Sequence, residues 1–307
     1  MIVFTVSQNS RTRTLTLYNM NQILRKQNEP DFIRLLKAQR IAYKQCKRMQ
    51  IFDVLSLLIA IAFPLLTLVF PKLQNGLNAS GVLWTVAYLF TEYYRRRKTT
   101  EGANIQEQFD TQLYEIAWNR ILCKDKVNAD KIHQLAIKYT KDDLSNWYST
   151  KIEESLPREI AIIICQRINF SWEISQRRKY VNLLILLTGV YYLIYIAIAL
   201  FLNAGFFDLL VFISPSISFL IYGVMNIIAL KSHVASKNET IKLIDDEIDS
   251  YRTYQLKPTN VTLRSIQDVI FYERTIPEKI PDWFYKINKS KNENIIDDIV
   301  LTIQKNL

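Results

Sequence analysis

Four apolar stretches divide the 307-residue chain, and each is a candidate membrane-spanning helix. A bilayer core of roughly 30 Å requires about 20 residues of helix. The stretches cover about residues 51–70, 79–94, 181–202 and 205–230. The rest of the chain is dense in charge, a segregation that is not typical of a soluble globular protein. The second stretch is short and contains Glu92, so by length alone it fits a span and a buried helix equally well.

The positions of Lys and Arg favour four spans. Basic residues gather on the cytosolic side of membrane helices. Clusters of them precede the first and third stretches and follow the second and fourth. Three spans would place the cluster at 95–98 outside the cell, whereas four spans place every basic cluster inside. The sequence therefore predicts an all-α integral protein of the inner (cytoplasmic) membrane, with two transmembrane hairpins and both termini in the cytosol.

The polar segments predict further helices in the cytosol. Pro157 suits a first helical turn and no helix breaker follows, so one helix is expected to run from the cytosol into the third stretch. Shorter helices are expected at 130–139, 143–151 and 295–303. The expected organisation is a poorly defined lead (1–19), a cytosolic amphipathic helix (20–50), transmembrane hairpin 1 (51–94), a cytosolic helical region (95–180), transmembrane hairpin 2 (181–230) and a C-terminal cytosolic helical region (231–307).

Residues suited to metal or nucleophilic chemistry are sparse. The cysteines Cys46, Cys123 and Cys165 are far apart, and the two histidines form no HExxH motif. Neither His133 nor His233 points to a base beside a nucleophile. We therefore expect no metal, no cofactor and no catalytic residues, and we do not expect an enzyme.

Basic and aromatic residues crowd the predicted cytosolic regions, and the chain carries a formal net charge of +10. Aromatic rings stack on nucleobases and Arg binds phosphate. The same residue types also fill helical cores and lie beside anionic lipids, so both interpretations stay open. The candidate ligand-binding residues are Arg40, Trp118, Arg167, Trp172, Arg177, Trp283 and Tyr285.

A polar stripe follows the fourth apolar stretch. Ser214, Ser218, Tyr222 and Asn226 recur every four residues and share one face of a helix. Polar groups within a span usually turn toward protein or water. The stripe therefore fits either the lining of a pore or a seam between helices.

Short motifs occur in a fixed order around the four stretches. They are QN at 27–28, LLKAQRIAYKQCK at 35–47, QEQFDTQLYEIAWN at 106–119, NWYS at 146–149, LPREIAIIICQRINFSWE at 156–173 and IPDWFY at 280–285. In this order they resemble the SMODS-associated four-transmembrane effector family, over nearly the whole chain from Met20 onward. The segment before Met20 lies outside the resemblance.

The resemblance implies a role in bacterial anti-phage defence by cyclic-oligonucleotide signalling. A partner nucleotidyltransferase would make a cyclic nucleotide, and the effector would respond by forming a pore in the inner membrane and stopping the infected cell. A single bundle of four helices offers no wide lumen, so a homo-oligomer in the lipid bilayer is expected. The alternatives are a signalling scaffold or receptor without a pore, and a membrane-bound enzyme.

Overall fold

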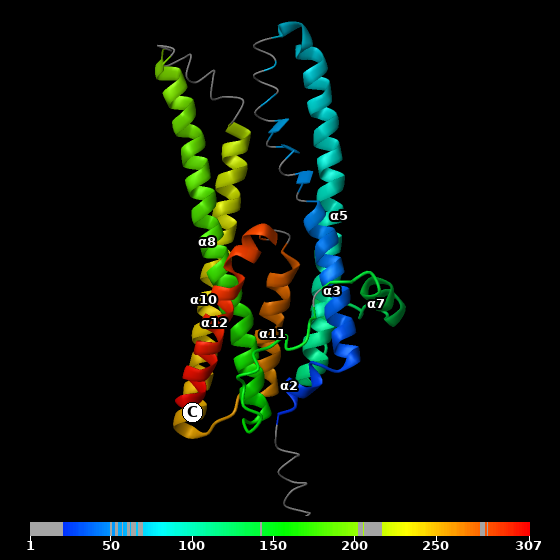
Figure 1. Cartoon of the computed structure of the whole chain (residues 1–307), viewed down its shortest axis with the longest axis vertical. Coiled ribbons are helices and arrows are strands. Elements are labelled where there is room, and N and C mark those ends of the chain that lie inside the picture. Colours follow the sequence, from blue (N-terminus) through cyan, green and yellow to red (C-terminus); the bar gives the residue numbers. More distant parts are fainter. Residues whose placement is uncertain are drawn as a thin grey trace, which may run out of the picture.

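The chain is helical throughout the part that its computed structural model describes (Figure 1). The described residues are 21–49, 70–141, 143–201, 217–276 and 282–307, with positions 51, 52, 55, 56, 58, 59, 62, 66, 205 and 280. Every regular element among them is a helix, which confirms the all-α prediction there. Within the same residues, no helix combines the length and the apolar character that crossing a bilayer requires.

Three long helices dominate the architecture. The elements are α2 (Ile23–Lys26), α3 (Pro30–Arg48), the 3-10 turn η1 (Pro71–Leu73), α5 (Gln74–Tyr114), α6 (Arg120–Cys123), α7 (Ala129–Ala136), α8 (Arg158–Phe201), α10 (Ile217–Tyr254), α11 (Asn260–Thr275) and α12 (Asp282–Lys305). At 1.5 Å per residue, the 41, 44 and 38 residues of α5, α8 and α10 correspond to roughly 57–66 Å each.

Local sequence explains where several helices begin and end. Pro30 opens α3, at a position where its missing N–H is not needed. The side chains of Asn119, Asn128 and Thr259 accept backbone N–H groups at the first turns of α6, α7 and α11. The chain leaves α5 at Glu115, which adopts the left-handed conformation.

The predicted helix that starts after Pro157 is confirmed as α8. The amphipathic helix predicted within 20–50 corresponds to α3, and the one predicted at 130–139 corresponds to α7. The predicted C-terminal helix begins earlier than expected, as part of α12. Two further helices, α5 and α10, run without a break past the predicted boundaries at 94 and 230, so each joins an apolar segment to a polar one.

The helix predicted at 143–151 is wrong, because the described part of that segment is irregular. Two of its backbone N–H groups donate to side chains near the start of the described chain. The N–H of Asn146, which has a positive φ, donates to Asn28 Oδ1 at 2.8 Å, and the N–H of Tyr148 donates to Gln27 Oε1 at 2.8 Å. These bonds replace the helical pattern and tie the segment to the end of α2.

A hydrophobic core holds the long helices together at the end that is drawn lower in Figure 1. It gathers buried side chains from α3, α5, α8 and α11, among them Leu36, Phe109 and the fully buried run Ile160–Cys165. Helix α3 packs along α5, α10 along α8, and α11 contacts both α5 and α8 (Figure 1). Gly102 permits the close approach of α3 to α5, because a Cβ there would lie 3.0 Å from the Tyr43 ring.

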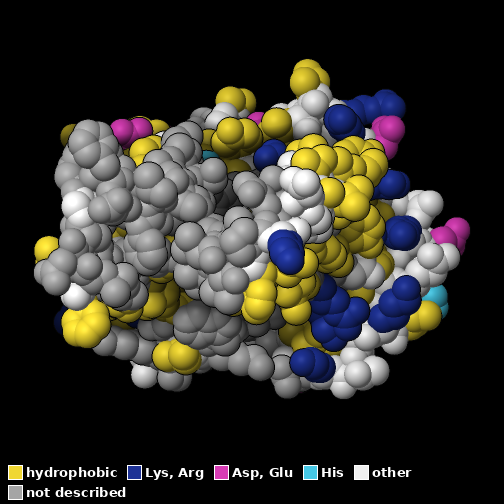
Figure 2. Space-filling model, turned by 90° about the horizontal axis from the view of Figure 1, so that it is seen from above, with side chains coloured by type: hydrophobic (Ala, Val, Ile, Leu, Met, Phe, Trp, Pro, Cys, Tyr) yellow, Lys and Arg dark blue, Asp and Glu magenta, His cyan; other side chains and the backbone are white. Residues whose placement is uncertain are grey.

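Beyond this core, residues 74–94 of α5, 182–201 of α8 and 217–229 of α10 project in one direction (Figure 1). We call these three parts the projecting segments. Large apolar side chains are exposed along them, including Val82, Leu83, Val86, Leu89, Phe90, Ile185, Leu186, Leu187, Val190, Leu193, Ile194, Leu200 and Phe201. Figure 2, seen from the projecting end, shows a broad hydrophobic patch with Lys and Arg gathered at its margin.

We expect Gly102→Val to destabilise the fold. The added side chain must displace the packed ring of Tyr43, and overpacking of this kind costs about 1–3 kcal/mol. Thermal unfolding of the purified chain measures the effect. Gly81→Val, in the same helix but with no atom within 4 Å of its Cβ, is the matched control. Equal unfolding temperatures for the two variants would contradict the close α3–α5 contact.

Candidate functional site

An ion pair between Asp110 and Arg274 lies inside the helical core. The Asp110 carboxylate is fully buried and accepts from Arg274 Nη1 at 2.5 Å and from the Tyr148 hydroxyl at 2.8 Å. Arg274 also donates to Asn169 Oδ1 at 3.1 Å. Burial disfavours the cation, but the Asp110 carboxylate, together with Tyr148, Tyr43 and Glu107, more than offsets burial and raises the pKa of Arg274. The guanidinium therefore stays charged, and its contacts connect α5, α8 and α11.

A second buried carboxylate extends the network toward the far end of α11. Glu107 accepts from Arg264 Nη2 at 2.7 Å and from Gln267 Nε2 at 2.8 Å. Burial raises the pKa of Glu107, and the charge of Arg264 opposes the rise. The same Gln267 amide donates to Asp110 Oδ2 at 3.1 Å, so both carboxylates belong to one network.

Another ionic cluster connects α10 to α8 and α11 on the side of the projecting segments. The buried ammonium of Lys237 contacts Glu173 and lies 3.2 Å from Glu273 Oε2. His233 Nδ1 lies 3.2 Å from Glu273 Oε1. Burial lowers the pKa of Lys237 to about 8, against the attraction of Glu273. Burial alone would raise the pKa of Glu273, but the hydrogen bond with His233 and the charge of Lys237 hold it below its ordinary value.

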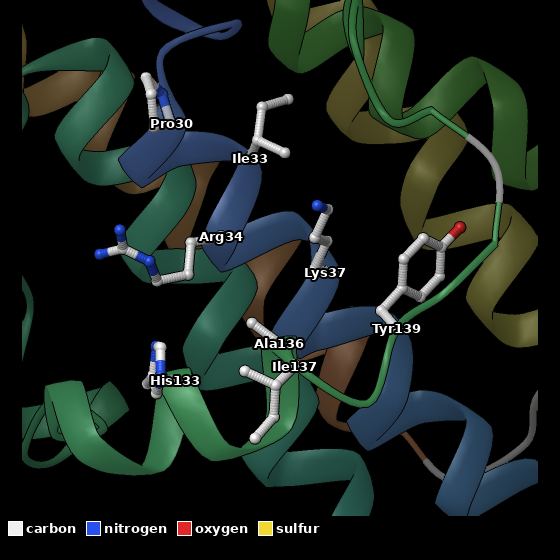
Figure 3. A pocket seen from close by; sticks show the side chains of 8 residues that line it. All are labelled: Pro30, Ile33, Arg34, Lys37, His133, Ala136, Ile137 and Tyr139. Carbon is white, nitrogen blue, oxygen red and sulfur yellow. The ribbon is translucent and has the colours of Figure 1, made fainter.

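Two grooves on the described surface could admit a ligand. The first, of about 400 Å³, lies between α3 and α7 and is lined by Arg34, Lys37, His133 and Tyr139 together with apolar side chains (Figure 3). The second, of about 460 Å³, lies between α8 and α10. Both volumes fall in the range of about 300–1,000 Å³ that is usual for small-molecule sites.

Two candidate ligand residues outside α8, Arg40 and Trp118, make contacts within the chain. The Arg40 guanidinium lies 5.0 Å from the centre of the Trp147 ring. The Trp118 indole donates to the carbonyl oxygen of Lys124 at 2.8 Å. Trp283 and Tyr285 fall in α12, and their side chains lie outside the described part.

The three candidates on α8 lie closer together. Arg167 binds Asp245 through two hydrogen bonds of 2.6 and 3.3 Å. Trp172 is partly buried and packs against the main core. Arg177 is buried, with its Nε 3.7 Å from Glu173. The described candidates thus do not converge on one groove, although Arg167 Nη1 reaches Ser171, which lines the groove between α8 and α10, at 3.5 Å.

The predicted polar stripe lies at the edge of the described structure. Ser214 is outside the described residues. Ser218, Tyr222 and Asn226 fall in α10, and their side chains are outside the described part. The choice between a pore lining and a helix seam therefore stays a prediction.

Sequence reasoning did not identify the buried network as a site. One signal was present, since Asp110 directly follows Phe109 in the apolar stripe that also contains Ile105 and Leu113. A carboxylate beside such a stripe requires a buried partner. Nothing in the sequence names Arg274 as that partner.

The chain belongs to the family described as the SMODS-associating 4TM effector domain, whose model matches residues 21–301. It is 30% identical, over 298 residues, to a "Probable CBASS effector molecule" of Bacillus cereus (strain VD146), and the match covers 92% of this chain and 98% of the relative. No solved structure matches the chain. The family resemblance of the sequence motifs is therefore confirmed.

We expect Asp110→Asn to destabilise the core strongly. The change leaves the buried Arg274 cation without its counter-charge, a loss that costs about 3–5 kcal/mol. Unfolding of the full-length chain in denaturant measures the difference. The double variant Asp110→Asn/Arg274→Met should recover part of the loss, because it also removes the uncompensated charge.

Asp245→Asn is the matched control, because it removes a carboxylate from a half-exposed ion pair with Arg167. Pairs of this kind contribute about 0–1 kcal/mol. A loss for Asp110→Asn no larger than that of the control would mean that the Asp110–Arg274 pair does not hold the core.

Proposed function

We propose that the protein is a membrane effector of bacterial anti-phage defence that responds to a cyclic oligonucleotide by permeabilising the inner membrane. The family description names an effector with four transmembrane segments, and the relative's name places that protein in CBASS. In this proposal a partner nucleotidyltransferase makes the messenger, and the chain acts on the bilayer without catalysing a reaction.

The exposure of apolar side chains on the projecting segments carries the proposal. Leu83 and Phe90 in α5 are 71% and 72% exposed, and Leu193 in α8 is 65% exposed. Soluble monomers rarely expose continuous apolar surface on this scale, whereas lipid tails would cover it. A helix also suits the bilayer because its backbone hydrogen bonds are made within the segment.

Basic residues support the same placement. The cluster at 95–98 follows the projecting segment of α5, and the cluster at 177–179 precedes that of α8. In α10, Lys231 lies two residues after the end of the projecting segment. Since Lys and Arg favour the cytosolic face, the core and both termini would lie in the cytosol.

The proposed topology has two hairpins, with spans at 51–70 and 79–94 and at 181–202 and 205–230. Four helices pack around one another without a wide lumen, so a pore would require several copies of the chain. The polar stripe on the fourth span is the proposed lining.

Activation requires two conformational states. A ligand shifts such an equilibrium only by its differential affinity, and a change from about 1% to 99% open needs roughly 5.5 kcal/mol. Three helices, α5, α8 and α10, pass from the core into the projecting segments without a break. A ligand that repositions one of them in the core would therefore move its membrane half as well.

Dye release from liposomes that carry the purified protein tests the proposal. We expect one member of a panel of cyclic di- and trinucleotides to trigger release, while linear mononucleotides and protein-free liposomes give none. Flotation of the vesicles checks that the protein is inserted. Inserted protein that releases no dye with any nucleotide would contradict a nucleotide-gated pore and favour a scaffold, and release without any nucleotide would contradict gating.

A further inference from the structure

The groove between α8 and α10 presents a row of polar groups suited to an anion. Ser171, Ser175, Arg178 and Asn182 follow one another at steps of four, three and four residues, so they share one face of α8. Asn238 of α10 faces them across the groove. The row therefore combines hydroxyl, guanidinium and amide donors along one line.

Several of these donors have no partner within the described part of the chain. Arg178 forms no ion pair there, and the amides of Asn182 and Asn238 form no hydrogen bond there. Lys179 adds a second positive charge to the same lining. No carboxylate is present among the described residues that line the groove.

The groove between α3 and α7 lacks this arrangement. Its Arg34 forms an ion pair with Asp31 at 2.9 Å. The side chains of Arg34 and Lys37 diverge in Figure 3, so their charges do not meet at one point. Because this groove also has two cations in its lining, one of them already paired, it is a matched control.

Apolar side chains in the groove between α8 and α10 indicate which class of anion it would bind. Ile174 and Ile241 contribute apolar surface beside the donors. Inorganic phosphate would make no use of that surface, whereas a phosphodiester carries organic substituents on both sides of its charge. The fork of an Arg side chain matches two phosphate oxygens.

We propose that the groove between α8 and α10 binds a phosphodiester, held at its phosphate by Arg178 and Lys179 and at its substituents by the amides of Asn182 and Asn238. Two sources share this chemistry, namely a cyclic oligonucleotide and the headgroup of an anionic phospholipid. The groove ends at Asn182, where the projecting segment of α8 begins, so a ligand there contacts the junction between core and membrane half. The nucleotide source rests on the proposed function, whereas the groove itself does not.

The test compares Arg178→Gln/Lys179→Gln with Arg34→Gln/Lys37→Gln in the full-length protein. One arm measures binding of the cyclic di- and trinucleotide panel to detergent-solubilised protein by calorimetry. The other measures retention of phosphatidylglycerol against phosphatidylcholine by native mass spectrometry. We expect the first variant to bind one of the two ligands at least about tenfold more weakly than the wild type does. The control should change the affinity for either ligand by less than about twofold.

Each outcome has a defined meaning. Weaker nucleotide binding by Arg178→Gln/Lys179→Gln would identify the groove as the messenger site. Weaker retention of phosphatidylglycerol by the same variant would identify it as a headgroup site. No loss in either arm, or equal loss in the control variant, would overturn the proposal. Dye release by the wild type is measured in parallel, because it tests the proposed function independently of the groove. Nucleotide-triggered release by the wild type, together with unchanged ligand binding by the groove variant, would overturn the groove and leave the proposed function standing.

A second variant covers the case in which the charge changes disturb folding. Asn182→Leu/Asn238→Leu keeps both cations and removes the two amide donors. This variant should bind the same ligand more weakly, in the same assay in which Arg178→Gln/Lys179→Gln loses affinity. Unchanged affinity would exclude these amides from the site and overturn their assignment.

Discussion

The buried pair of Asp110 and Arg274 is the constraint on which the rest of the structure depends. It places opposite charges in the core, where little water can solvate them, so each requires the other. Because Tyr148, Asn169 and Gln267 complete its hydrogen bonds, the pair fixes the positions of α5, α8 and α11 together. Apolar contacts alone could tolerate sliding between these helices, whereas a satisfied ionic network permits one register.

This fixed core controls the projecting segments through helix continuity. Helices α5 and α8 contribute to the network directly, and α10 is tied to α8 and α11 through Lys237 and its two carboxylates. Each of the three helices then continues into a segment with exposed apolar side chains. A ligand at the groove between α8 and α10 would therefore act on two helices that this smaller cluster joins.

The sequence pattern predicted several of the helices, but it did not predict which side chains pair between them. The apolar spacing in α3 and the absence of a breaker after Pro157 predicted real helices, because both signals are local. Asp110 and Arg274 are 164 residues apart and resemble the surrounding charges, so nothing local pairs them. The irregular segment after 143 was mistaken for a helix because its hydrogen bonds go to Gln27 and Asn28, more than 100 residues away.

The proposed placement of the projecting segments in the bilayer is tested most directly by cysteine labelling in intact membranes. Leu83 and Tyr254 are 71% and 72% exposed in the isolated chain, so in water Leu83→Cys and Tyr254→Cys would react alike. The native cysteines are buried and contribute little background. In inside-out vesicles, we expect a membrane-impermeant maleimide to label Tyr254→Cys and to leave Leu83→Cys unlabelled. Equal labelling of both positions would contradict a membrane location for the projecting segment of α5.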